Sequence, residues 1–466
     1  MIPRKIFVPL IALFLAAQAC TLPGASVTPE GTAPPFDPAQ GEPVEPSAPP
    51  PPAETAAPPT DLPTEEPAPE ATALPAAPPA LRVAYISGDR NIWLYDHNRR
   101  TAIPLTTAAD AIQLAISSDG QWIAYTRSAV APQVELWLVA AEAIEGQPPE
   151  NRALLTAADL SAFDPAAFAV VPYLFDWIPG THKIVFTTRQ EFEEGLGLIL
   201  YDDLRTVDTD TGEIGALLPA GEGGNPFVSL DGLQIAFTTP QGVHLVNMDG
   251  TNLRRDLVVF PQVVTYSEYQ YYPRVSWGTD SSEIVVIIPP SDPLAIPVLP
   301  TMVWRISAVS AAGELVGQLT DASFFGGDSS PAGDFSKLAY LRLFGDLQDN
   351  QQTLVIANLD GTGAHEVTTA GTGTLQWAWS PGGHGLVFWQ VEPGGLYQAF
   401  IDGDIVQTII IRESNILGPV QWLDETRILF WEREGELYRL VLLEIGGGLE
   451  VLAESPDLPG GFDFAP

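Results

Sequence analysis

The chain has 466 residues, of which 45% are hydrophobic, and it carries a formal net charge of −37. Lys5, Lys183 and Lys337 are its only lysines. A surface this acidic repels the phosphates of nucleic acids and anionic lipid headgroups, which argues against DNA or RNA as a partner. The length has room for one large repeat domain or for several ordinary domains.

Residues 1–19 have the features of a signal peptide. Two basic residues, Arg4 and Lys5, precede an apolar stretch over residues 6–17 that is too short to span a bilayer as a stable helix. Ala17-Gln18-Ala19-Cys20 resembles a bacterial lipobox, although lipoboxes usually carry Leu where Ala17 stands. The resemblance implies lipidation of Cys20 and anchoring in a bacterial cell envelope, on the extracytoplasmic side. An ordinary secretory peptide cleaved after Ala19 is the alternative. Cys20 is the only cysteine, so no internal disulfide is expected.

Residues 20–80 are predicted to be a disordered tether behind the lipidated cysteine. Thr21 to Ala80 holds 19 of the 45 prolines and nine acidic residues, with no Lys, Arg or His. Almost no large apolar side chains are available to offset the entropy of ordering such a segment. The interpretation is an extended spacer that holds a globular domain, residues 81–466, away from the membrane.

A short pattern recurs about eight times after residue 81. In its clearest copy, Asn225–Gly232 ends in Ser-x-Asp-Gly and is followed at once by the β-branched and aromatic run Gln234–Thr238. This is a β-hairpin signal, because Asp bonds to its own backbone and Gly takes the positive φ of the turn. Repeats of this length are typical of a β-propeller.

The strand after each turn is the easiest to align, and it defines eight units. These strands are Val83–Tyr85, Trp122–Tyr125, Ile184–Phe186, Ile235–Phe237, Ile284–Val286, Leu338–Tyr340, Leu386–Phe388 and Ile428–Phe430. The first unit lacks a first strand, and Gly461–Pro466 resembles an orphan first strand. The prediction is an all-β protein, an eight-bladed propeller of four-stranded antiparallel blades closed by the C-terminal strand. A seven-bladed ring is the alternative, because the third unit is loosely patterned.

Ser-x-Asp-Gly followed by Ile-Ala-Phe or Ile-Ala-Tyr resembles the WD-like repeats of the TolB C-terminal propeller. It is also similar to the propellers of prolyl-oligopeptidase-type enzymes. The resemblance covers about 385 residues and implies the fold rather than an activity. TolB proteins have six blades and a separate N-terminal domain, whereas this chain has a Pro-rich tether in that place.

No catalytic or metal-binding constellation is evident in the sequence. There is no Gly-x-Ser-x-Gly elbow and no hydrolase domain after the repeats. The five histidines, His97, His182, His244, His365 and His384, are scattered without metal-ligand spacing. Asp208–Gly212 faintly resembles a calcium loop but is better explained as a hairpin turn. No cofactor and no catalytic residue are therefore predicted, although the many carboxylates leave a catalytic pair open.

One face of the ring is expected to carry a binding site. The longest predicted connections, between second and third strands and between successive blades, emerge on the same face. Tyr266, Tyr269, Tyr271 and Tyr272 gather in one connection, and a second connection holds the neighbouring set Arg189, Glu191, Phe192, Glu193 and Glu194. Tyrosine offers a large contact area with a polar tip, which suits peptide or glycan recognition. The alternative is that these tyrosines pack beneath a long loop.

The leading hypothesis is a monomeric, membrane-anchored, non-catalytic module that binds a protein, peptide or glycan. A carbohydrate-active propeller, a glycoside hydrolase or lyase with carboxylates around the channel, is the first alternative. A TolB-like role in envelope assembly is the second. The identity of the ligand does not follow from the sequence.

Overall fold

The computed structural model describes residues 81–142, 149–193, 199–267, 269–295, 297–322, 329–344, 351–370, 375–390, 394–402 and 405–465. The predicted signal peptide, Cys20, the Pro-rich tether and Glu194 lie outside the described residues. The regular secondary structure is almost entirely β-strand, with one short helix in the described part.

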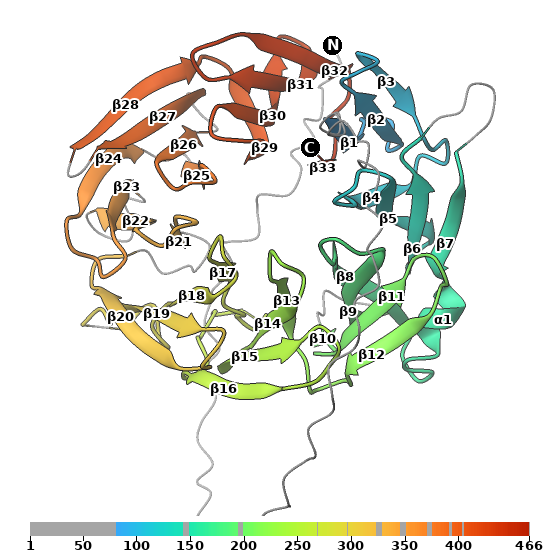
Figure 1. Ribbon diagram of the computed structural model, residues 1–466, viewed down its shortest axis with the longest axis horizontal. Helices are drawn as coiled ribbons and strands as arrows, with labels where there is room; N and C mark the ends of the chain where they lie inside the picture. The colour runs from blue at the N-terminus through green and yellow to red at the C-terminus, as the bar shows by residue number, and fades with distance from the viewer. Residues whose placement is uncertain are drawn as a thin grey trace, which may run out of the picture. The chain divides into compact units, whose positions relative to one another are not determined.

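Eight antiparallel sheets form a ring around a central channel, and each sheet is one blade (Figure 1). In blades 1 to 4 the strands, from the channel outward, are β33 (Phe462–Ala465), β1 (Arg82–Ile86), β2 (Ile92–Asp96) and β3 (Thr101–Pro104); β4 (Ala111–Ile116), β5 (Trp122–Val130), β6 (Gln133–Ala140) and β7 (Asn151–Leu155); β8 (Ala169–Trp177), β9 (Lys183–Glu191), β11 (Leu204–Asp208) and β12 (Ile214–Leu218); and β13 (Asn225–Val228), β14 (Gln234–Thr239), β15 (Gly242–Asn247) and β16 (Arg254–Val259). A short extra strand, β10 (Ile199–Leu200), pairs with the end of β9.

Blades 5 to 8 follow the same plan. Their strands are β17 (Val275–Trp277), β18 (Glu283–Ile288), β19 (Thr301–Ser307) and β20 (Gly313–Leu319); β21 (Ser329–Pro331), β22 (Lys337–Phe344), β23 (Gln351–Asn358) and β24 (His365–Ala370); β25 (Leu375–Trp379), β26 (Gly385–Gln390), β27 (Gly395–Asp402) and β28 (Ile405–Arg412); and β29 (Asn415–Trp422), β30 (Arg427–Glu434), β31 (Leu437–Glu444) and β32 (Leu449–Ser455). The prediction of eight blades is confirmed, and the alternative of seven is wrong.

The C-terminal strand closes the ring as predicted. β33 pairs antiparallel with β1, and Val83 lies opposite Phe464 while Tyr85 lies opposite Phe462. Phe462–Ala465 thus complete a blade whose other strands begin the domain. Pairing with β33 covers the edge of β1, which would otherwise be a template for aggregation.

The Ser-x-Asp-Gly turns have the geometry that their residues predict. In the turn between β13 and β14, the Ser229 hydroxyl and the Leu233 amide both donate to Asp231 Oδ1, at 2.6 and 3.0 Å. Gly232 follows with φ of +70°, a region that favours glycine. Because these bonds join residues within five positions of each other, the turn forms from local sequence alone.

Hydrophobic side chains fill the interfaces between neighbouring blades. The buried residues group into eight clusters, and each cluster joins one blade to the next around the ring. Strand alternation produces this, since Ile184 and Phe186 face blade 2 while Val185 between them faces blade 4. Trp93, Trp137 and Trp304, which the sequence assigned to blade packing, lie against these clusters.

A second set of tryptophans joins the inner strands of adjacent blades through hydrogen bonds. The indole Nε1–H of each donates to a backbone carbonyl of the preceding blade, at 2.8–3.1 Å. The pairs are Trp177 with Ala115, Trp277 with Phe227, Trp379 with Ser330, and Trp422 with Ala378. Buried carbonyls need such partners, so these bonds hold the channel wall together.

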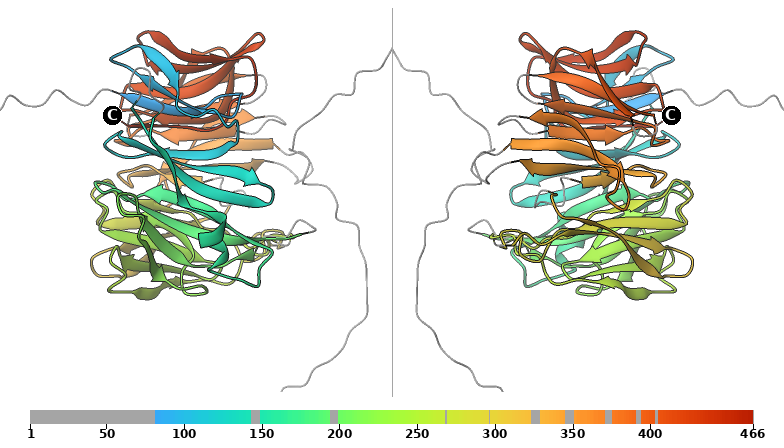
Figure 2. Two further views of the ribbon diagram at one scale, coloured as in Figure 1. Left: turned by 90° about the vertical axis from the view of Figure 1, so that its right-hand side faces the viewer. Right: turned by 90° about the vertical axis from the view of Figure 1, so that its left-hand side faces the viewer.

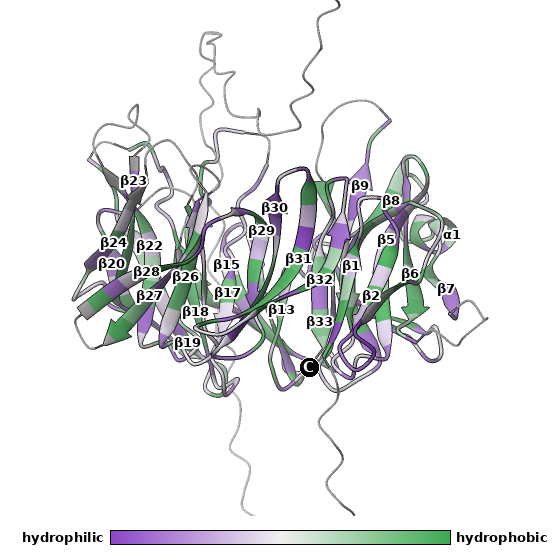
Figure 3. Cartoon of the chain, turned by 90° about the horizontal axis from the view of Figure 1, so that it is seen from above, coloured by the Kyte–Doolittle hydropathy of each residue, from purple (hydrophilic) through white to green (hydrophobic). Residues whose placement is uncertain are grey.

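The strands run between two faces of the ring (Figure 2). We call the face that carries the hairpins between second and third strands and the connections between blades the loop face, and the opposite one the turn face. The β9 hairpin rises on the loop face, and the C-terminus lies at the turn face (Figure 3). The helix α1 (Ala157–Ser161) lies in the connection before β8 and begins with a capping box made by Thr156 and Asp159. No helix within the described ranges is long and apolar enough to span a bilayer.

Candidate functional site

The tyrosine-bearing connection between β16 and β17 is fastened to its neighbours on the loop face. Tyr266 donates its hydroxyl to Asp292 Oδ1 at 2.6 Å, and the Val264 amide donates to the Ser291 carbonyl at 2.8 Å. Both partners belong to the connection between β18 and β19. Tyr266 nevertheless remains 62% exposed, so it packs under nothing and is open to a ligand.

Tyr271 and Tyr272 turn toward blade 3 instead. With Tyr173 of β8, Leu200 of β10 and Asn225 of β13 they line a cavity of about 540 Å³. The Tyr272 hydroxyl donates to the Asp202 carboxylate, at 2.8 Å to Oδ1. Burial is the main cause that raises the pKa of Asp202, and the bond from Tyr272 opposes it. This bond fixes one wall of the cavity.

The second predicted set of site residues lies next to this cavity but does not line it. Arg189 and Glu191, at the end of β9, form an ion pair with each other. Arg189 is the register partner of Leu200, which does line the cavity. Phe192 directly follows β9 and is partly buried. The structure therefore brings Tyr271 and Tyr272 close to this hairpin, while Tyr266 and Tyr269 line a separate hollow of about 620 Å³.

The tyrosine cavity has two neighbouring cavities that share wall residues on the way to the central channel. It shares Asn225 and Tyr272 with a cavity of about 340 Å³, which in turn shares Phe227 and Arg274 with a channel cavity of about 650 Å³. The channel cavity is lined by Trp377 and Trp389 and by serines of the inner strands, among others. Small-molecule sites have volumes of roughly 300–1,000 Å³, so each of these cavities is large enough for a ligand.

Two carboxylates occupy equivalent inner-strand positions. The residues that pair with the middle of each second strand are, in blades 1 to 8, Asp463, Ala115, Asp176, Phe227, Ser276, Ser330, Ala378 and Gln421. Asp463 and Asp176 thus flank blade 2. Their charges are close enough that Asp176 contributes to the raised pKa of Asp463.

Asp463 is held by backbone amides on both sides. Ile116 N donates to Oδ2 and Phe464 N to Oδ1, each at 2.9 Å. Burial still raises its pKa to about 6. Asp176 accepts a 2.8 Å bond from Trp177 N. Its carboxylate is open to the channel, but the surrounding walls exclude much of the bulk water, and this desolvation raises its pKa.

Arg274, immediately before β17, faces the same space. It lines both the 340 Å³ cavity and the channel cavity. The sequence analysis missed Asp176, Asp463 and Arg274, because nothing in their local motifs sets them apart from other surface charges. Alignment of the first strands by register would have shown the two aspartates, since Asp176 stands before Trp177 as Gln421 stands before Trp422.

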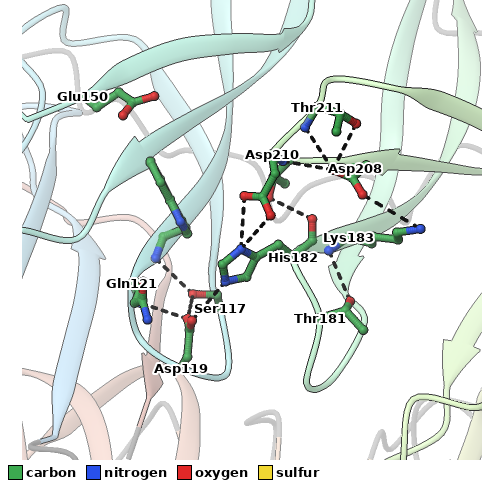
Figure 4. A network of polar contacts seen from close by, with 12 residues as sticks. Ser117, Asp119, Gln121, Glu150, Thr181, His182, Lys183, Asp208, Asp210 and Thr211 are labelled. Atoms are coloured by element: carbon green, nitrogen blue, oxygen red, sulfur yellow. Dashed lines mark hydrogen bonds and ion pairs between the residues drawn. The ribbon is translucent and has the colours of Figure 1, made fainter.

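A polar network on the turn face joins blades 2 and 3 (Figure 4). His182 places Nε2 at 3.1 Å from Asp119 Oδ2 and Nδ1 at 3.1 Å from both oxygens of Asp210. The two carboxylates raise the pKa of His182. Asp210 lies in the hairpin turn between β11 and β12, as the interpretation of residues 208–212 predicted. Of the residues that the structure describes, no three His, Cys, Asp or Glu side chains gather as ligands for a metal ion.

Comparison with known proteins assigns no family to this chain. No protein-family model and no curated protein sequence matches the chain. Among solved structures it is similar to an oligogalacturonate lyase in complex with manganese (16% identity, 70% of this chain and 92% of that one, TM-score 0.44) and to a eukaryotic initiation factor (12%, 84% and 99%, 0.48). It is also similar to TolB from Acinetobacter baumannii (13%, 71% and 64%, 0.33). This chain is an eight-bladed propeller with such WD-like neighbours.

Proposed function

We propose that this protein is a membrane-anchored, extracytoplasmic and non-catalytic binding propeller that takes a protein, peptide or glycan on its loop face. The observation that carries the proposal is the series of neighbouring cavities, sharing wall residues, from Tyr271 and Tyr272 to the channel. Its upper part is lined by tyrosine rings and by the amides of Asn225 and Gln270, with no charged side chain among the lining residues. Rings that stack and amides that donate and accept suit sugars and peptide backbones.

Exposed apolar side chains extend this surface. Tyr266, Leu294 and Leu299 are 62%, 48% and 42% exposed, and they come from the two connections that bond to each other through Asp292. Contiguous apolar groups rimmed by polar ones are typical of interaction sites. A rigid ring beneath them lowers the entropic cost of ordering the loops when a ligand binds.

The binding role is tested by crosslinking and pull-down from intact cells that carry the full chain. We expect the double substitution Tyr269→Ala and Tyr271→Ala to abolish capture with unchanged melting. Leu230→Ala with Leu233→Ala is the matched control, because these side chains are 58% and 65% exposed on the turn face. Equal capture by both variants would contradict the proposal. Recovery of envelope proteins rather than glycans would favour a TolB-like assembly role.

Anchoring rests on the lipobox-like segment that ends at Cys20. Metabolic labelling with a fatty acid, followed by fractionation, tests it. We expect label on the wild-type chain and its recovery with membranes, and neither for Cys20→Ser. A chain that is unlabelled and is released after cleavage behind Ala19 would instead be an ordinary secreted protein.

The Asp176 and Asp463 pair favours one second candidate, a carbohydrate-active enzyme. Two carboxylates in one site, both with a raised pKa, can serve as acid and base at a glycosidic bond. Both oxygens of Asp463 are occupied by backbone amides, however, which places this candidate second. Product release from a polysaccharide panel that Asp176→Asn abolishes would establish the enzyme and overturn the non-catalytic role.

A further inference from the structure

Two side chains of opposite charge line the 340 Å³ cavity, and they come from the blades on either side of β13. Asp176 comes from β8 of blade 3 and Arg274 from the residue before β17 of blade 5. Between them lies β13 of blade 4, which contributes Asn225 and Phe227 to the same cavity. The three inner strands are neighbours at the channel (Figure 1).

Neither charge is neutralised within the described part of the chain. The one hydrogen bond recorded for the Asp176 carboxylate comes from Trp177 N, and Arg274 is not among the causes that shift its pKa. Arg274 itself has no ion pair or hydrogen bond to any described residue. Every other described arginine and lysine has at least one polar or electrostatic neighbour. In a chain with net charge −37, a guanidinium without a carboxylate partner among the described residues is unusual.

The negative and positive groups also lie on opposite sides of the cavity. Asp463 stands in blade 1 and adds its negative potential to that of Asp176, whereas Arg274 is the only basic residue lining the cavity. A ligand in this space therefore meets a negative wall on one side and a positive group on the other. Both Asp176 and Arg274 are exposed within the channel, so each charge is accessible to a ligand.

We infer that this cavity binds a small zwitterion, a free amino acid or a dipeptide, with its ammonium group on Asp176 and its carboxylate on Arg274. The inference rests on the proposed binding function and names the ligand class of the middle cavity of that series. Guanidinium groups bind carboxylates through two parallel hydrogen bonds. Leu174, Phe175 and Phe227 supply apolar walls for a side chain, and the Asn225 amide is available for a polar group.

The size of the cavity limits the ligand. A volume of about 340 Å³ lies at the lower end of the range of small-molecule sites, roughly 300–1,000 Å³. The cavity shares the wall residues Asn225 and Tyr272 with the tyrosine cavity.

The test is calorimetric titration of the full chain with L-leucine, L-phenylalanine and the dipeptide Leu-Leu. N-Acetyl-L-leucine lacks the ammonium charge and L-leucinamide lacks the carboxylate. We expect at least one zwitterion to bind and each blocked analogue to bind roughly tenfold or more weakly, as expected for loss of one charged hydrogen bond. Comparison of leucine with Leu-Leu shows whether the site prefers a free amino acid or a dipeptide, since both carry an ammonium and a carboxylate group.

Variants assign each end of the ligand. Asp176→Asn keeps an acceptor for Trp177 N and should abolish the preference for leucine over its acetylated form only. Arg274→Gln should abolish the preference over leucinamide only. Glu436→Gln and Arg100→Gln, which make the same charge changes outside the cavity, should preserve both preferences. If the Asp176→Asn variant does not fold, the comparison of free and blocked leucine on the wild-type chain still tests the inference.

Two outcomes would overturn the inference. One is equal binding of free and blocked leucine, and the other is no zwitterion binding at millimolar concentration. If the same preparation still captures its partner through the tyrosine surface, only the zwitterion site is refuted. If the Tyr269→Ala, Tyr271→Ala variant captures as well as wild type while leucine binds, the loop-face proposal fails and the channel site stands.

Discussion

The hydroxyl of Tyr272 lies 2.8 Å from the carboxylate of Asp202 and donates a hydrogen bond to it. The two residues are 70 positions apart, and the bond joins the connection after blade 4 to blade 3. It lies at the boundary between the tyrosine cavity and the smaller cavity below. This polar contact therefore holds a side chain that both cavities share as part of their walls.

Tyr272→Phe should destabilise the fold by about 1–3 kcal/mol, because a partly buried carboxylate loses its only recorded side-chain donor. The pKa of Asp202 should rise further. The measurement is urea unfolding at pH 7. Tyr266→Phe is the control, since its bond to Asp292 is at an exposed site and its loss should leave the unfolding curve unchanged. Equal midpoints for the two variants would show that Tyr272 has no special role.

Trp277→Phe should lower the free energy of unfolding by about 1–2 kcal/mol more than Trp304→Phe does. Both tryptophans are partly buried in blade 5, but only Trp277 donates its indole N–H to a neighbouring blade, at 2.8 Å from the Phe227 carbonyl. Guanidinium chloride unfolding of both variants measures the difference. If the two variants are equally stable, the hydrogen bond between blades contributes nothing beyond packing.

His182 should make stability depend on pH. Its pKa is raised in the folded state by Asp119 and Asp210, so its stabilising contribution is full below the unfolded pKa of about 6.5. The contribution is lost as pH rises through the folded pKa. Melting temperatures of wild type and His182→Gln, measured between pH 5 and 8, should differ most at the acidic end. A constant difference across that range would refute the charged contact.

Asp463 should titrate near pH 6 in the folded protein. Because this pKa is above the unfolded value of about 3.9, the folded state binds the proton more tightly than the unfolded state does. Its contribution to stability is full below the unfolded pKa and is lost as pH rises from about 4 to about 6. Carbon-detected NMR of the aspartate carboxyls measures the midpoint. An ordinary midpoint near 4 would mean that water reaches this carboxylate freely.

Removal of residues 462–466 should lower stability by more than about 3 kcal/mol, since loss of a buried aromatic side chain alone costs about that much. Phe462 is only 5% exposed, and β1 would be left with an unpaired edge. Thermal unfolding and size-exclusion chromatography should report a lower melting temperature and self-association. A synthetic peptide of residues 461–466 should restore the melting temperature. Failure of that rescue in a folded, truncated chain would argue against closure by this strand.

The sequence by itself determined the blades and their closure. The bonds of each turn, such as Ser229 to Asp231, join residues close in the chain, and alternation along each strand sets which side chains face the next blade. Such local rules repeat, so eight copies can be counted without a structure. The first unit lacked a first strand, and the final segment Phe462–Ala465 was a first strand without a blade. Pairing the two with each other was the one arrangement that completed both.

Only the tertiary structure decided which side chains of different blades lie close together at the channel. Asp176 and Arg274 belong to blades 3 and 5, and their approach depends on blade number, strand register and the curvature of the closed ring together. Tyr272 reaches Asp202 for the same reason. The tyrosine cluster was visible in the sequence, but whether each ring faced solvent or a cavity depended on long loops whose paths no short-range rule specifies.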